Sequence, residues 1–313
     1  FFMKDLLLVI FTKIIEFFEN KTILSLLFLF SSAFLSAFLD ALTVTAVLIS
    51  VSIGFYNIFA DNLKNKTITQ KEFDQGKAFL RDIVMHGAVG TALGGVCTIV
   101  GEPQNLLIAK IAGWEFIEFF IRMAPITMPV LIVGLLTCYL LEQFRILGFG
   151  NQLPDSVRDV FNEYATYEND TITIKQKSEL LVEFLVLIFL IVALAFHIAA
   201  VGLIGLAVII LLTSFKGITE EHHLGEAFHE ALPFTALLAV FFAIVSVIHE
   251  QHLFTPVITY VLAQDPSTQP VIFYGANGFL SAISDNVFVA TIYINEVKAA
   301  YDSEIINLDQ FNK

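Results

Sequence analysis

The amino-acid sequence predicts an all-α, polytopic membrane protein with inverted-topology repeats, re-entrant hairpins and broken transmembrane helices. The first observation is composition, because 57% of the 313 residues are hydrophobic and 32 Phe stand against 17 Lys and Arg. Soluble domains are far more polar. The second is a set of apolar runs near the length of about 20 residues that crosses a bilayer core. The third is a phrase that occurs twice, as FLSAFLDALTV over residues 34–44 and FLSAISDNVFV over residues 279–289.

The charge balance and the cysteines exclude several function classes. The formal net charge is −13, and dispersed acids do not attract nucleic acid. Cys97 and Cys138 both lie in apolar runs, which indicates neither a disulfide framework nor a zinc site. The sequence has no phosphate-cradling Gly-x-x-x-x-Gly-Lys motif, so direct use of ATP is not expected. The chain begins inside an apolar run without the layout of a signal peptide, which predicts a piece of a longer protein.

Taken in chain order, the apolar runs occupy residues 1–18, 22–60, 83–112, 116–141, 180–214, 231–248 and 271–294. As one helix, the run 22–60 would be about 60 Å long, so we expect it to fold back as a hairpin near Asp40. The run 180–214 is expected to split near residues 197–201. Residues 271–296 are too short for two crossings and are expected to form a re-entrant hairpin, which persists at membrane depth only where protein or water satisfies its backbone.

Two polar segments, residues 61–82 and 143–178, carry much of the positive charge and are therefore expected as cytoplasmic loops. Residues 218–297 contain no Lys or Arg, so the outward-facing parts of the second half are expected there. This predicts a first repeat over residues 1–142, incomplete at its N-terminus, and a cytoplasmic linker loop over 143–178. A second repeat, incomplete at its C-terminus, is predicted over 179–313.

A constant offset of 245 residues aligns the two repeated phrases and places Asp40 opposite Asp285. The first is expected to enter the membrane from inside and the second from outside, as in inverted-repeat transporters with a site at the midplane. A charge at membrane depth is costly, and function is its default interpretation. The alternative is that such an Asp only caps a loop.

A glycine-rich stretch, GAVGTALGGVCTIVGEPQN over residues 87–105, predicts a broken helix within residues 83–112. Glycine weakens a helix by about 1 kcal/mol and proline by about 3 kcal/mol, so we expect unwinding near residues 100–103. Pro103 suits the first position of a new half-helix. The freed carbonyls, together with the side chains of Glu102 and Asn105, are hard oxygen ligands for an alkali cation. The alternative is that the glycines serve only close helix packing.

The segments FLDALTVTAVLISV, GGVCTIVGEPQN and SAISDNVFVATIYINE resemble the NhaB family of sodium/proton antiporters. Its superfamily also includes arsenite exporters and sodium-coupled carboxylate carriers. In that superfamily each half has a hairpin with a Ser-Asn-Thr-like tip and then a broken helix with a Gly-x-Pro-x-Asn-like turn. The resemblance implies that Ser284, Asp285 and Asn286 form the second tip, with Asp in place of the usual Asn. It implies that residues 101–105 form the first turn, while the first tip keeps only Asp40.

The second turn would fall beyond residue 313, which implies that part of the ion site is missing from this chain. The resemblance implies a secondary active transporter, not an enzyme, that exchanges Na⁺ or Li⁺ for H⁺ by alternating access in the inner membrane of a bacterium. The expected partners are these ions, protons and the lipid bilayer, without a cofactor or nucleic acid, and a homo-oligomer is compatible with the sequence. The candidate ion-binding and proton-coupling residues are Asp40, Asp285, Ser284, Asn286, Glu102 and Asn105, with Asp40, Asp285, Asn105 and Asn286 as Na⁺ ligands.

Other functions stay open at this point. An arsenite exporter or a sodium-coupled anion transporter is disfavoured because carboxylates would repel an anion, and a passive channel is less suited to paired hairpins. An intramembrane aspartyl protease would need Gly-x-Gly before an Asp, which neither Asp40 nor Asp285 has. Arg122 is expected to pair with Glu118 or to snorkel. The segment EEHHLGEAFHE, residues 220–230, is expected as a solvated amphipathic helix, with a metal site or pH sensor as the alternative.

Overall fold

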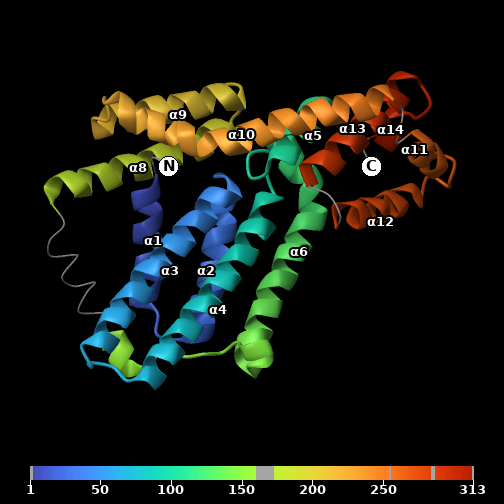
Figure 1. Ribbon diagram of the computed structural model, residues 1–313. Helices are drawn as coiled ribbons and strands as arrows, with labels where there is room; N and C mark the ends of the chain where they lie inside the picture. Colours follow the sequence, from blue (N-terminus) through green and yellow to red (C-terminus); the bar gives the residue numbers. More distant parts are fainter. Residues whose placement is uncertain (1–2, 160–172, 252, 254, 283–285, 312–313) are drawn as a thin grey trace. The chain divides into compact units, whose positions relative to one another are not determined.

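The computed structural model is all-helical over the residues that it describes, which are 3–159, 173–251, 253, 255–282 and 286–311. The chain forms two compact units (Figure 1). Unit 1 comprises Phe1–Glu102 and Phe116–Thr219, and unit 2 comprises Pro103–Glu115 and Glu220–Lys313.

Unit 1 is built around a helical bundle whose central helix is α2. Helix α2 packs most extensively on α4 and also contacts α1, α3 and α6, while α8 and α9 pack on each other (Figure 1). The elements of this unit are α1 (Lys4–Phe17), α2 (Lys21–Ser36), α3 (Ala41–Lys64), α4 (Gln70–Gly95), α6 (Phe116–Phe144), η1 (Ile146–Gly148), α8 (Ile174–Ala195) and α9 (Val201–Lys216).

Glycines let α2 and α4 touch backbone to backbone. A Cβ added at Gly90 would lie 2.2 Å from the Leu29 carbonyl oxygen, and one at Gly94 would lie 1.8 Å from the Ala33 carbonyl oxygen. Real Cβ atoms do not approach backbone so closely, so only glycine fits at these two positions. The glycines therefore do serve helix packing, as one interpretation of the sequence held, and they do so in a helix that also breaks.

The predicted interruption of the segment 83–112 is present. Helix α4 ends at Gly95, and α5 (Pro103–Ala112) begins at Pro103 as expected. The break starts at Val96, earlier than the expected 100–103, because the paired Gly94 and Gly95 already weaken the helix there.

The other predicted turns in unit 1 also agree with the structure. The run 22–60 folds back between Ser36 and Ala41, at the end of α2 and the start of α3. The run 180–214 splits between Ala195 and Val201, and His197 has a left-handed φ of 48° at this corner.

Residues 61–82 differ from the expected polar loop, because α3 continues to Lys64 and α4 begins at Gln70. A capping box explains the early start of α4: Thr69 accepts from the Glu72 backbone N–H, and the Glu72 side chain accepts from the Thr69 N–H. Ser156 Oγ also donates to Glu72 Oε1 at 2.6 Å. Charged residues had suggested a loop, yet here they form the first turns of a helix.

Unit 2 is organised around α13, which packs on α5, α10, α11, α12 and α14. Its helices besides α5 are α10 (Glu221–Glu250), α11 (Thr255–Leu262), α12 (Gln269–Ser281), α13 (Asn286–Asp302) and α14 (Leu308–Phe311). A small core forms around Ile258, Val289 and Tyr293. The two arms expected over residues 271–296 correspond to α12 and α13, and α13 is longer than expected. The expected solvated helix 220–230 and the span 231–248 form a single helix, α10.

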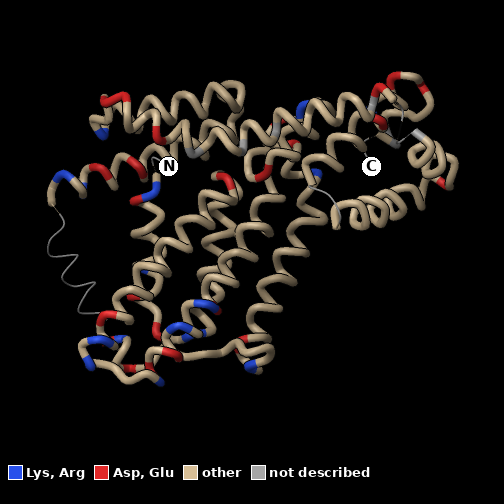
Figure 2. Tube along the Cα trace, viewed as in Figure 1, with Lys and Arg blue, Asp and Glu red and all other residues tan. Residues whose placement is uncertain are grey.

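Among the residues that the structure describes, four helices are long and apolar enough to cross a membrane: α3, α6, α8 and residues 221–248 of α10. Figure 2 shows that the Lys, Arg, Asp and Glu residues of unit 1 gather toward the ends of its helices. Helix α6 exposes many large apolar side chains, among them Ile121, Ile132 and Leu136. Long apolar helices with exposed apolar side chains are typical of a multi-pass membrane protein whose apolar surface faces lipid.

Candidate ion-binding site

Asp40 lies at the tip between α2 and α3 and caps the N-terminus of α3. Its Oδ2 accepts a hydrogen bond from the Thr43 backbone N–H at 3.1 Å, and the residue is half-buried. Capping satisfies one of the free N–H groups that begin every helix. Asp40 thus caps a helix, at a break inside an apolar run.

The tip contacts the interrupted segment 96–102. Thr98 Oγ1 donates a hydrogen bond to the Ala37 carbonyl oxygen. A Cβ on Gly101 would lie 2.3 Å from the Gly95 carbonyl oxygen and 2.8 Å from that of Ser36, so only glycine lets this backbone approach the end of α2. The end of the first predicted hairpin and the first predicted turn therefore meet within unit 1.

Glu102 ends this segment, and its carboxylate folds back over α4. A Cβ on Gly95 would lie 2.9 Å from Glu102 Oε1, so the absence of a side chain there makes room for the carboxylate. Asp40 and Glu102 thus belong to two segments that pack together in unit 1. Two of the predicted site residues, Asp40 and Glu102, therefore lie in neighbouring segments at this end of the α2/α4 pair.

Buried hydroxyls add neutral oxygens on the same helices, and sequence reasoning missed most of them. Ser32 and Ser36 of α2 are fully buried, and their Oγ atoms have no hydrogen-bond partner within the described part of the chain. Thr91 of α4 is also buried, and its Oγ1 lies 3.2 Å from Thr45 Oγ1. Buried polar atoms are normally satisfied, so two unpartnered hydroxyls on one helix need an explanation. The Ser-x-x-x-Ser spacing, which puts both on one helix face, is the signal that could have found them.

The other predicted site residues belong to unit 2. Asn105 is buried on α5, and the exposed Asn286 is the first residue of α13, the helix on which α5 packs. Ser284 and Asp285 lie outside the described residues. The expected approach of Asp40 and Asp285 to within roughly 15 Å therefore stays a prediction.

A second polar group lies at the opposite end of α2, and sequence reasoning did not identify it. Here the Glu142 carboxylate of α6 accepts from three side chains through the same oxygen, Oε1. The donors are Lys21 Nζ at 3.1 Å, Ser25 Oγ at 2.8 Å and His86 Nε2 at 3.0 Å. We refer to Lys21, Ser25, Asp82, His86 and Glu142 as the α2 N-terminal cluster.

Asp82 of α4 completes this cluster. Its carboxylate is fully buried and lies 3.9 Å from Lys21 Nζ. It also accepts from Arg81 Nη2 at 2.8 Å and from Asn151 Nδ2 at 2.9 Å. Buried charges are tolerated when each has partners, which is the case here.

Outside the membrane spans, the pKa of Glu72 is lowered to about 2 by its hydrogen bond from Ser156 and then by those from Thr69. Each of these bonds favours the charged carboxylate.

Arg122 pairs with Glu118 at 2.7 Å, one of the two outcomes expected for this arginine.

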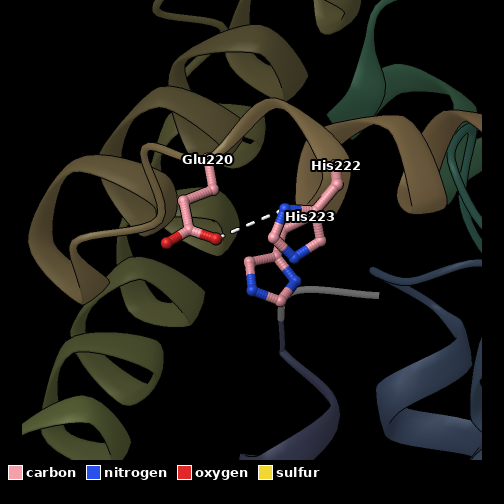
Figure 3. Close-up of side chains that lie close together, drawn as sticks. All are labelled: Glu220, His222 and His223. Carbon is pink, nitrogen blue, oxygen red and sulfur yellow. Dashed lines mark ion pairs between the residues drawn. The ribbon is translucent and has the colours of Figure 1, made fainter.

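Figure 3 shows Glu220, His222 and His223 near the start of α10. His222 Nδ1 lies 3.3 Å from Glu220 Oε2, and one ligand atom of each residue falls within 4.8 Å of the others. All three residues are exposed. This is the solvated helix start expected from the sequence, and its open arrangement differs from the closed ligand shell of a structural metal site.

Comparison with known proteins gives consistent matches along the whole chain. The family model for "Bacterial Na+/H+ antiporter B (NhaB)" matches residues 1–313. A protein of Marinomonas sp. (strain MWYL1) named Na(+)/H(+) antiporter NhaB is 57% identical over 327 residues, which cover 100% of this chain and 65% of that protein. Proteins of the same name from Saccharophagus degradans and Yersinia enterocolitica are each 56% identical, with 66% and 62% of their lengths covered. The chain thus spans slightly less than two thirds of the curated relatives that it matches.

Proposed function

Because the chain belongs to the NhaB family of bacterial Na⁺/H⁺ antiporters, we propose that the complete protein exchanges Na⁺ or Li⁺ for H⁺ across the inner membrane of a bacterium. The observation that carries this proposal is the match of one transporter family to all of residues 1–313. The family is one of transporters and not of enzymes, which disfavours the intramembrane protease. Two carboxylates at the meeting of hairpin tip and turn also suit a cation better than arsenite or an organic anion.

The proposed architecture is a pair of inverted repeats with re-entrant hairpins. Helices α2 and α12 end at Ser36 and Ser281, and α3 and α13 begin at Ala41 and Asn286, so both pairs of boundaries are 245 residues apart. The residues that follow α2 and α12, Ala37 and Ala282, have the same backbone angles, φ −68° and ψ −20°. This equivalence supports a repeat of helix–tip–helix units.

The lengths of the first arms support re-entrance. Helix α2 has 16 residues and α12 has 13. At 1.5 Å per residue they extend about 24 Å and 20 Å, which is less than the roughly 30 Å of a bilayer core. Each can therefore enter the membrane and stop at a tip inside it, which is where inverted-repeat transporters place their ions.

In the proposed mechanism Asp40 and Asp285 are carboxylates that bind either Na⁺ or a proton. Ser284, Asn286, Glu102 and Asn105 supply further oxygens, and Asp40, Asp285, Asn105 and Asn286 contact the ion. Arrival of Na⁺ stabilises the charged carboxylates and expels their protons, and loss of Na⁺ reverses this. Competition for one site is sufficient for exchange, provided that the site opens to one side at a time.

The geometry at Asp40 adds a step that belongs to this chain. Its carboxylate accepts a hydrogen bond from the Thr43 N–H and so caps the start of α3. Protonation weakens this cap. The start of α3 is thereby made sensitive to whether the site holds a proton or a cation.

The test is ion-driven proton movement in proteoliposomes that contain the complete protein. With an imposed pH gradient, addition of Na⁺ or Li⁺ should dissipate the gradient and choline should not. Arsenite or a dicarboxylate that dissipated the gradient in place of Na⁺ would contradict the proposal.

A further inference from the structure

The start of α10 holds two imidazole rings and a carboxylate side by side, on an open surface. The ring centroids of His222 and His223 are 4.0 Å apart, and His222 Nδ1 lies 3.3 Å from Glu220 Oε2 (Figure 3). His223 is the least exposed of the three residues, and its side chain is still 51% exposed. A solute in the surrounding water can therefore reach all three groups directly.

Helical spacing explains why these side chains gather. The His223 backbone N–H donates to the Glu220 carbonyl oxygen at 3.2 Å, which closes a turn at the start of α10. Residues three apart then lie on the same face of the helix. The same spacing brings Glu226 beside His223, where its Oε2 lies 3.9 Å from the imidazole Nδ1. A second carboxylate thus adjoins the first three groups.

The chemistry of these groups fits a divalent transition metal ion. Imidazole nitrogens bind Zn²⁺, Cu²⁺ and Ni²⁺, whereas the alkali cations prefer oxygen. Two ligands of a tetrahedral Zn²⁺, each about 2.0–2.1 Å from the metal, are about 3.4 Å apart. The 3.3 Å between His222 Nδ1 and Glu220 Oε2 agrees with this separation. One ligand atom from each of the three residues lies within 4.8 Å of the others, so rotation of exposed side chains is enough to close the site.

A surface ion pair explains the arrangement less well. An exposed pair such as that of Glu220 with His222 stabilises a protein by about 1 kcal/mol or less. It gives no role to the second ring. If both rings were protonated to pair with the carboxylates, two positive charges would lie next to each other and repel. A metal ion binds both imidazoles in their neutral form and so avoids this repulsion.

We propose that Glu220, His222 and His223 form a surface binding site for a divalent transition metal ion. Water completes the coordination, and Glu226 is the adjacent carboxylate that can replace one water. Such an open site exchanges its metal with the solvent, unlike the closed ligand shell of a structural site. The site lies within unit 2 and contains none of the residues proposed to bind Na⁺, so it does not depend on the proposed function.

Calorimetric titration of the purified complete protein with Zn²⁺ tests the proposal. The protein should carry no histidine tag, and the titration should be done at about pH 7.5, where most imidazoles are neutral. We expect His222→Ala and His223→Ala each to weaken Zn²⁺ binding by at least about tenfold, because loss of even an outer-shell partner costs about 10- to 100-fold. The matched control His229→Ala removes another exposed histidine of α10 and should bind Zn²⁺ like the wild type.

X-ray absorption at the zinc edge identifies the ligands independently of affinity. The loaded wild type should show nitrogen or oxygen neighbours at about 2.0–2.1 Å together with the outer-shell scattering of imidazole. The imidazole signal should be smaller in His223→Ala at the same zinc content.

Two results would overturn the proposal. One is unchanged Zn²⁺ affinity in either histidine variant. The other is loss of Zn²⁺ affinity when choline chloride is replaced by NaCl at constant ionic strength, because that would place the metal at a site for alkali cations. Absence of Na⁺-driven proton flux in the wild type would contradict the proposed function and leave the zinc measurements unaffected.

Discussion

Both ends of helix α2 carry buried polar side chains, but the hydrogen bonding of these side chains differs between the two ends. At the N-terminal end, Lys21 and Ser25 donate to Glu142, so charges and hydroxyl are paired within the protein. At the other end, the hydroxyls of Ser32 and Ser36 are buried and have no partner in the described part of the chain. Paired charges hold helices together, whereas the unpartnered hydroxyls lie on the helix that leads to the proposed ion site. The difference agrees with the proposal that one end of α2 serves attachment and the other serves ion binding.

The largest expected effect is on the two aspartates of the proposed site. Asp40→Asn and Asp285→Asn keep the size of the side chain and remove its proton-binding charge, so each should abolish Na⁺-driven proton movement in proteoliposomes. Glu118→Gln serves as the control and should exchange normally, because it only breaks an exposed pair with Arg122. Wild-type rates in both aspartate variants would leave Glu102 as the acid to be tested.

Lys21→Met tests the attached end of α2. It leaves two buried carboxylates, Asp82 and Glu142, without their shared lysine, so the free energy of unfolding should fall by about 3–5 kcal/mol. Stability can be measured by denaturant titration of the detergent-solubilised protein. The matched control Lys13→Met breaks a partly exposed pair with Glu16 and should cost about 1 kcal/mol or less. Equal stabilities of the two variants would mean that the α2 N-terminal cluster does not hold the bundle together.

Gly94→Ala tests the close contact near the other end. Its Cβ would meet the Ala33 carbonyl oxygen at 1.8 Å, so α2 and α4 must separate, at a cost of about 3 kcal/mol. Gly205→Ala is the matched control in α9, where nothing lies within 4 Å of the added Cβ. This control should be neutral or more stable by about 1 kcal/mol, because alanine favours a helix. A Gly94→Ala protein as stable as Gly205→Ala would contradict the backbone contact.

Ser36→Ala tests whether the unpartnered hydroxyls contribute to the binding of Na⁺. Loss of one neutral oxygen should weaken the binding of Na⁺ by about 1 kcal/mol. The Na⁺ concentration that gives half-maximal exchange should then rise about fivefold, with little change in the maximal rate. Stability should hold or improve, since a buried unsatisfied hydroxyl is removed. Unchanged Na⁺ dependence would assign Ser36 to packing alone.

The smallest effect is expected at the half-buried Glu72. Its pKa in the folded protein is lowered to about 2, from an ordinary value of 4.5, by hydrogen bonds from Ser156 and Thr69. The carboxylate therefore contributes stability above about pH 4.5, and that contribution is lost as the pH falls toward about 2. Thermal midpoints measured through this range should fall less steeply with pH in Glu72→Gln than in the wild type. Parallel curves would show that these hydrogen bonds do not affect stability.

Local sequence signals predicted the breaks in the helices. Asp40 inside an apolar run and Pro103 after a row of glycines both mark chain reversals or half-helices that the structure contains. These features depend on propensities of neighbouring residues, which a single sequence displays directly. The 61–82 segment could have been predicted better, since Thr69-Gln-Lys-Glu72 is a visible capping box.

The α2 N-terminal cluster could not be predicted in this way. Lys21 and Glu142 are 121 residues apart, and each lies near the edge of an apolar run, where a charged residue is ordinarily solvated. Only the packing of α2, α4 and α6 makes them partners. The unpartnered state of Ser32 and Ser36 likewise depends on which helix covers them and not on their own sequence.

The division of the chain into two units has a mechanical consequence. The polypeptide crosses from one unit to the other at residues 102–103, 115–116 and 219–220. Any rotation of one unit with respect to the other must therefore twist the backbone at these three joints. The first joint directly follows Glu102, a residue of the proposed ion site, and the backbone of the neighbouring Gly101 packs against the carbonyl oxygens of Gly95 and Ser36. A rotation that twists the chain at this joint would therefore disturb a residue that is proposed to hold the cation.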